Sequence, residues 1–149
     1  MAGVCWGSFA AESGPGAAEE WFNFNPEGDE FGKSAIDLRR LNEKFAGEHG
    51  FIAVANGQFV HSASGQPVRF WAVNGPSGES RDGSELRRTA RLLAKYGVNL
   101  VRHHRAVFDK DGELNPESVR RIQAVVEAMK AEGIYTHLSI YFPLWFTPR

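Results

Sequence analysis

Apolar and polar positions follow two different periods along the second half of the chain. Residues 68–74, 98–102 and 134–141 are short runs rich in aliphatic and aromatic side chains, as is typical of buried strands. Between these runs, residues 84–96 and 116–132 carry apolar side chains at helical spacing, with one apolar face each. The pattern therefore predicts strand, helix, strand, helix and strand, and right-handed crossovers would make the three strands parallel.

Local signals predict where the two helices begin and end. Ser84 is the expected N-cap of the first helix, and Gly97 is the residue expected just beyond its end. Asn115 is the expected N-cap of the second helix, with Pro116 at the first helical position and Gly133 after the last turn.

A β-hairpin is predicted ahead of the first parallel strand. Short apolar runs flank Asn56-Gly57, and this dipeptide tolerates the positive φ values of a type I′ turn. A hairpin at this place in a parallel α/β barrel would cover the amino-terminal mouth, away from the end that binds ligands.

These elements predict an α/β fold, namely a partial (β/α)8 TIM barrel with its first three strands and two helices, preceded by the hairpin. The 149 residues are far fewer than the roughly 250 of a complete barrel. We therefore expect residues 35–149 to be the amino-terminal portion of a truncated barrel. Residues 1–34, which are rich in Gly, Ala and Glu without periodicity, are expected to form a largely irregular leader or linker.

Composition narrows the classes of partner and cofactor. The formal net charge is -1, so the chain has no excess of basic residues that would attract nucleic acid. No run approaches the roughly 18 apolar residues of a membrane span. The single cysteine, Cys5, cannot form an internal disulfide, and no Cys/His spacing typical of metal sites occurs, so we expect neither a metal nor another cofactor.

Candidate binding residues lie at and beyond the ends of the three predicted parallel strands, where α/β barrels bind ligands. They are polar or aromatic: Asn74, Arg102, His104, Tyr141 and Trp145. The guanidinium of Arg102 follows an apolar strand and requires an acceptor, either in a ligand site or in a salt bridge to a neighbouring loop. The aromatic rings of Tyr141 and Trp145 are suited to stacking on a sugar, with ordinary loop packing as the alternative.

Other polar residues favour structural roles. His103 and His104 are adjacent on an extended strand, so their side chains point to opposite faces and are poorly placed to bind one metal. His137 alternates with apolar neighbours inside the third strand and is expected to be a structural histidine with satisfied hydrogen bonds. The Asn42-Glu43 pair precedes the hairpin and follows no strand, so it is expected on the surface or in a strap, away from the catalytic rim. No predicted strand ends in Asp or Glu, so no catalytic acid or base is assigned within the chain.

The segment from about Leu41 to Trp145 resembles the amino-terminal part of cellulase-like glycoside hydrolases related to family 5, a retaining clan of (β/α)8 barrels. The matching stretches are residues 41–44, 46–51, 56–60, 68–74, 92–104 and 133–135. The resemblance implies two catalytic glutamates after the fourth and seventh strands, beyond residue 149. It also implies that Arg102 keeps the nucleophilic carboxylate ionised. The family often has a histidine at the end of the third strand, where this chain has Tyr141.

We therefore expect the amino-terminal part of a retaining hydrolase that cleaves O-glycosidic bonds in a polysaccharide or oligosaccharide, inactive without the rest of the barrel. A carbohydrate is the expected partner, and the resemblance implies an extracellular or cell-envelope location. The alternative is a non-catalytic carbohydrate-binding or assembly module that holds sugar with Trp145, Tyr141 and Trp71. An isolated sheet with an open edge is also expected to self-associate.

Overall fold

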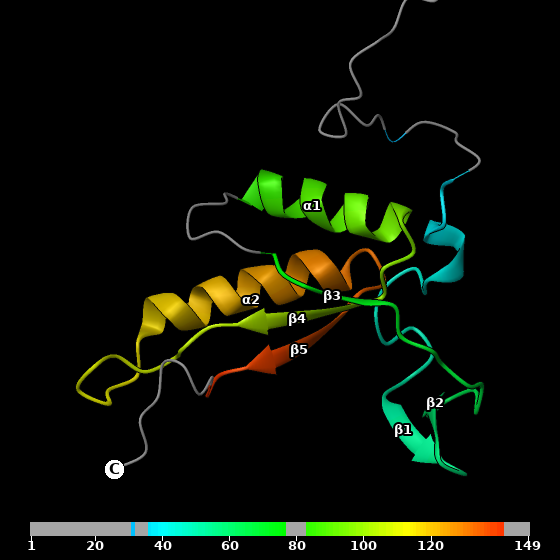
Figure 1. The fold of residues 1–149 in the computed structure, drawn as a ribbon, viewed down its shortest axis with the longest axis horizontal. Coiled ribbons are helices and arrows are strands. Elements are labelled where there is room, and N and C mark those ends of the chain that lie inside the picture. Colours follow the sequence, from blue (N-terminus) through cyan, green and yellow to red (C-terminus); the bar gives the residue numbers. More distant parts are fainter. Residues whose placement is uncertain (1–30, 32–35, 77–82, 142–149) are drawn as a thin grey trace, which may run out of the picture. The chain divides into compact units, whose positions relative to one another are not determined.

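A computed structural model describes residues 31, 36–76 and 83–141 of the chain. Within these residues it shows two β-sheets, two α-helices and the short 3-10 helix η2 (Arg39–Leu41), as Figure 1 shows. Apart from Phe31, the expected leader lies outside the described residues. The ring of Phe31 lies 4.7 Å from the Arg91 guanidinium, in a cation–π contact.

The hairpin forms where the sequence predicts it. Strands β1 (Ile52–Ala55) and β2 (Gln58–His61) pair antiparallel, with Ala55 opposite Gln58. The turn residues Asn56 and Gly57 have φ values of 52° and 75°, so both adopt the left-handed conformation that a type I′ turn requires.

The second sheet is parallel. Its strands β3 (Ala72–Asn74), β4 (Leu100–His104) and β5 (Tyr135–Ser139) lie in chain order, with β4 in the centre. The predicted α/β class and the parallel succession of strands are therefore confirmed. Both β3 and β5 are edge strands among the described residues.

The first parallel strand is shorter than predicted because several main-chain groups before Ala72 form hydrogen bonds with the hairpin or with a side chain. The Val68 N–H donates to the Phe59 carbonyl at 2.9 Å, which adds this segment to the hairpin. The side chain of Asn99 then accepts from the Trp71 N–H and donates to the Arg69 carbonyl, both at 2.8 Å. The Trp71 N–H is thus bonded to a side chain, while the Trp71 carbonyl accepts from the Asn99 backbone N–H at 3.1 Å, and the regular strand begins at Ala72.

Helices α1 (Gly83–Lys95) and α2 (Pro116–Lys130) lie on the same side of the parallel sheet (Figure 1). Ser84 lies inside α1, so the prediction that it caps this helix is wrong. The cap of α2 is confirmed, because Asn115 Oδ1 accepts from the Ser118 N–H at 3.0 Å and Pro116 takes the first helical position. Neither helix is both long enough and apolar enough to cross a bilayer.

The core fills the space between the two helices and the sheet. Fully buried side chains from each layer meet there, among them Ala90 of α1, Val101 of β4 and Met129 of α2. Because strand side chains alternate between faces, the neighbours of Val101 on β4 point to the opposite side. Arg102 is accordingly exposed on the face that neither described helix covers, which we call the open face.

Candidate functional site

Three polar side chains form a row across the open face of the parallel sheet. The strand register places Asn74 beside Arg102 and Arg102 beside His137, one residue from each strand. Parallel neighbours in register share a face, so the three side chains project together. All three are exposed. The next pair along β4 and β5 is His104 and Ser139, which extends the polar surface toward the carboxyl ends of the strands.

Arg102 makes no ion pair within the part of the chain that the structure describes. Its one hydrogen bond there joins Nη2 to Ser139 Oγ at 3.5 Å, at the long limit for such a bond. The salt bridge to a neighbouring loop is therefore not formed among these residues. The guanidinium is left with most of its donors facing the open face.

His103 and His104 point to opposite faces, as the sequence predicts. The His103 side chain is buried on the helix side. Burial lowers its pKa, and the nearby charges of Arg105 and His104 lower it further, against a hydrogen bond to the Pro76 backbone. His104 is half-buried on the open face. No metal-binding cluster of three His, Cys, Asp or Glu residues occurs in residues 36–76 and 83–141.

His137 was expected to be a structural histidine with satisfied hydrogen bonds, and that expectation is wrong. Its side chain is exposed, and this side chain makes no hydrogen bond or ion pair with any other described residue. The alternation within its own strand could not indicate this position as part of a site. Only its register with Arg102 on the neighbouring strand does so.

Tyr141 follows β5 at the carboxyl end of the sheet and is 65% exposed. Its ring stacks on Phe108, with centroids 6.1 Å apart and planes 21° from parallel. One ring face is therefore engaged in packing within the loop region. Trp145 lies outside the described residues.

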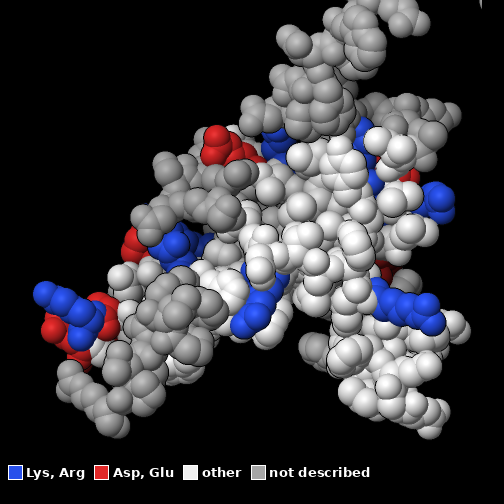
Figure 2. Space-filling model, in the orientation of Figure 1, with Lys and Arg blue, Asp and Glu red and all other residues white. Residues whose placement is uncertain are grey.

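Exposed aromatic side chains gather around the hairpin, at the other end of the sheet. Residues 51–68 contain no Lys, Arg, Asp or Glu, and Figure 2 shows a largely uncharged surface in this region. Phe59 packs edge-on against Phe70, and Phe70 against Tyr135, with centroids 5.7 and 5.9 Å apart. Trp71 is exposed just before β3. Because Trp71 precedes a strand and Tyr141 follows one, they lie at opposite ends of the parallel sheet.

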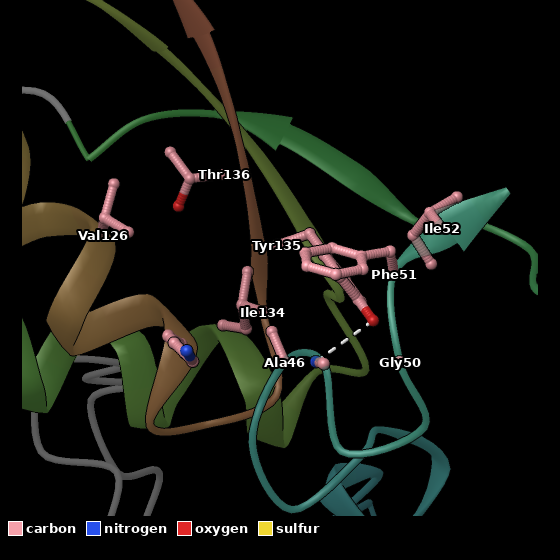
Figure 3. A pocket seen from close by; sticks show the side chains of 10 residues that line it. Ala46, Gly50, Phe51, Ile52, Val126, Ile134, Tyr135 and Thr136 are labelled. Atoms are coloured by element: carbon pink, nitrogen blue, oxygen red, sulfur yellow. Dashed lines mark hydrogen bonds between the residues drawn. The ribbon is translucent and has the colours of Figure 1, made fainter. Parts of the chain in front are cut away.

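A second polar cluster surrounds Glu43. Glu43 was expected on the surface or in a strap; the surface alternative is wrong, because its side chain is 6% exposed. Its carboxylate accepts from the Tyr135 hydroxyl at 2.6 Å and from the backbone N–H groups of His49 and Gly47 at 2.8 and 3.3 Å. The Gly47 N–H also approaches the Tyr135 hydroxyl oxygen at 3.2 Å, the dashed line in Figure 3.

The protonation states in this cluster follow from its contacts. Burial alone would raise the pKa of Glu43, but the hydrogen bonds from Tyr135 and the two backbone donors outweigh burial and lower it. Burial and the same carboxylate raise the pKa of Tyr135 to about 12. At neutral pH the pair is a carboxylate and a hydroxyl donor, at the amino-terminal end of β5.

No family model matches the sequence, and neither curated proteins nor solved structures provide a match. The candidate site therefore rests on the positions and contacts of the residues in this structure, without support from a related protein. The row of Asn74, Arg102 and His137 lies toward the carboxyl ends of parallel strands, and the Glu43 cluster lies at their amino-terminal ends.

Proposed function

We propose that this chain is the amino-terminal part of a retaining glycoside hydrolase, with β3, β4 and β5 as the first three strands of a (β/α)8 barrel. The observation that carries the proposal is the row of Asn74, Arg102 and His137 on the open face, opposite the helices. In such barrels the helices lie outside, and the ligand binds at the carboxyl ends of the strands.

In this proposal the chain contributes cationic and hydrogen-bonding groups, while the two catalytic glutamates follow residue 149. β3, β4 and β5 contain no Asp or Glu, and Arg102 has no carboxylate partner among the described residues. A nucleophilic glutamate placed beside Arg102 would have its pKa lowered by the adjacent positive charge. It would stay ionised for attack on the anomeric carbon, and the second carboxyl group would act as acid and then base.

The rest of the proposal follows from the resemblance. The substrate is a polysaccharide or oligosaccharide, and the enzyme acts outside the cell or in the cell envelope. Without further strands, the free edge of β5 favours self-association, because the outward main-chain groups of an edge strand are available for pairing.

The test begins with the reading frame beyond codon 149. The longest continuous chain is assayed on a panel of polysaccharides and incubated with 2-fluoro glycosides, which trap the covalent glycosyl-enzyme of a retaining mechanism. We expect a trapped adduct on a glutamate and a kcat lowered by about 100-fold or more in Arg102→Ala. Arg40→Ala, which removes an exposed arginine of η2 outside the row, is the matched control. A longer chain without a trapped adduct or hydrolysis would overturn the proposal.

The second candidate is a non-catalytic carbohydrate-binding module, which the exposed aromatic side chains near the hairpin favour. In that case the chain as it stands should bind soluble polysaccharide in affinity electrophoresis. Replacement of Trp71 by alanine should abolish this binding, because stacking on an aromatic face supplies much of the contact with a sugar. Retardation that depends on Arg102 and not on Trp71 would favour the hydrolase.

A further inference from the structure

The chain contains two Asn-Gly pairs, Asn56-Gly57 and Asn74-Gly75, and both asparagines are exposed. An asparagine that precedes glycine is prone to lose its side-chain amide. Glycine has no Cβ to keep its backbone nitrogen away from the side chain before it. The local sequence therefore gives the two pairs similar reactivity, and their structural surroundings decide which of them reacts.

The backbone nitrogen of Gly57 is free at the tip of the hairpin. Its N–H donates no hydrogen bond to any residue that the structure describes, and the Asn56 side chain has no hydrogen-bond partner among these residues. Apart from its chain neighbours, no atom lies within 4 Å of the position that a Cβ on Gly57 would take. Neither of the two reacting groups is therefore held in place by a described neighbour.

The hairpin is anchored at its base, away from this turn. The Ser62 N–H donates to the Phe51 carbonyl at 2.8 Å. His61 Nδ1, at the end of β2, lies 3.6 Å from the Oε1 atom of the buried Glu43 carboxylate. β1 and β2 have four residues each, and an isolated hairpin of two strands is only marginally stable. Local opening is therefore expected to begin at the exposed turn.

The backbone nitrogen of Gly75, in contrast, is held by the parallel sheet. Its N–H donates to the Arg102 carbonyl at 3.0 Å, and Asn74 pairs with Arg102 across β3 and β4. Attack by this nitrogen would break the hydrogen bond and separate the end of β3 from the central strand. The hydrogen bond that follows Asn74 in the row thus also protects the Asn74 side-chain amide.

We propose that Asn56 is a site of spontaneous deamidation and that the parallel sheet protects Asn74 from the same reaction. The Gly57 nitrogen attacks the side-chain amide carbon of Asn56, and the new N–C bond closes a succinimide ring. The amide nitrogen of Asn56 leaves as ammonia and takes with it the proton of the Gly57 N–H. Water then adds to either carbonyl carbon of the ring and opens it, which leaves aspartate or isoaspartate at position 56.

Both products add a carboxylate to a segment that has no acidic side chain, since residues 51–68 contain no Lys, Arg, Asp or Glu. Aspartate tolerates the left-handed conformation that Asn56 adopts at a φ of 52°, so this product keeps the turn. Isoaspartate inserts a methylene group into the main chain of the turn, which disturbs the pairing of Ala55 with Gln58. Aspartate therefore changes the charge of the hairpin, and isoaspartate also loosens it.

The test follows the unaltered chain during incubation in mildly alkaline buffer, which favours attack by the backbone nitrogen. Trypsin cleaves after Lys44, Arg69 and Arg81, so the two Asn-Gly pairs fall in separate peptides for mass spectrometry. We expect Asn56 to deamidate at least about tenfold faster than Asn74, because the Asn74 pair must first break a main-chain hydrogen bond of the sheet. In concentrated urea the two rates should converge.

Asn56→Gln is the matched control, because glutamine would have to close a larger ring and reacts more slowly. The mass change in the peptide of residues 45–69 should disappear, and the slow change in the peptide of residues 70–81 should stay the same. The proposal is overturned if Asn74 deamidates as fast as Asn56 in buffer. It is also overturned if Asn56 keeps its amide in buffer while both asparagines react in urea.

The structural consequence is measured on the isoaspartate form, which is separated by ion exchange and identified by labelling with protein isoaspartyl methyltransferase. Amides of β1 and β2 should exchange faster with solvent in this form, while amides of α2 should be unchanged. Equal protection of β1 and β2 in the two forms would contradict the loosening of the hairpin. These results are independent of the glycosidase proposal, which is tested at Arg102 on the open face.

Discussion

Arg102 of β4 and His137 of β5 are direct neighbours across the parallel sheet, in register on the open face. They are separated by 35 positions in sequence and come from two different strand–helix units. Both are exposed, and neither has a carboxylate partner among the described residues. A surface of this kind is suited to receiving a ligand or an acidic side chain from elsewhere.

The exposure of Arg102 predicts that it contributes little to folding. Arg102→Ala should change the free energy of unfolding by no more than about 0.5 kcal/mol, as is usual for exposed positions. Val101→Ala, one residue earlier, removes a fully buried side chain and should cost about 1–3 kcal/mol. Urea denaturation of the two variants measures both values. Equal losses would mean that Arg102 has a structural partner.

The hydrogen bond from Tyr135 to Glu43 should contribute measurably to stability. Tyr135→Phe keeps the ring and its edge-on contact with Phe70, and it removes one donor from a buried carboxylate. We expect a loss of about 1–3 kcal/mol in the free energy of unfolding. In a double-mutant cycle with Glu43→Gln, the two losses should be less than additive. Strict additivity would show that the two groups act independently.

Two glycines with similar backbone conformations should respond differently to alanine. Gly133 and Gly112 have φ values of 74° and 87°, so alanine at either position is strained by roughly 1–2 kcal/mol. A Cβ at Gly133 would also overlap the backbone carbonyl of Glu43, whereas a Cβ at Gly112 meets no atom within 4 Å. Gly133→Ala should therefore lower the thermal midpoint much more than Gly112→Ala. Similar midpoints would contradict the close approach at Gly133.

The buried His103 should make the domain less stable in acid. Its pKa is lowered in the folded state, chiefly by burial, so at mildly acidic pH the unfolded chain binds a proton that the folded chain does not. The contribution of His103 to the free energy of unfolding is complete above the ordinary histidine pKa of about 6.5, and it falls as the pH drops below that value. His103→Gln should show a smaller loss of unfolding free energy from neutral pH to about pH 5. An unchanged slope would contradict this assignment.

Much of the local structure could be predicted because it depends on residues close together in sequence. Asn56-Gly57 supplies the two positive φ values of the hairpin turn, and Asn115 caps α2 through a residue three positions away. The boundaries of β3 could not be read in the same way. They depend on Asn99, whose side chain forms hydrogen bonds with the main chain of Trp71 and Arg69, 28 and 30 positions away in sequence.

The candidate residues show the same division. Asn74, Arg102 and His104 were predicted as strand-end residues, and they share the open face as an α/β sheet requires. His137 was not predicted as a site residue, because its place in the row beside Arg102 depends on the register between two strands. The burial of Glu43 was also missed, since a carboxylate in a polar segment carries no local sign that a tyrosine 92 positions away will donate to it.

The order of strands and helices, the hairpin turn and the cap of α2 are consequences of periodicity and turn chemistry, which act over a few residues of the amino-acid sequence. Tertiary packing decided which side chains of the sheet face the helices, where the first parallel strand begins, and that Glu43 joins the hairpin to β5. These features depend on contacts between residues far apart in the chain. Such contacts exist only in the folded chain, in which apolar side chains of the helices and the sheet are removed from water.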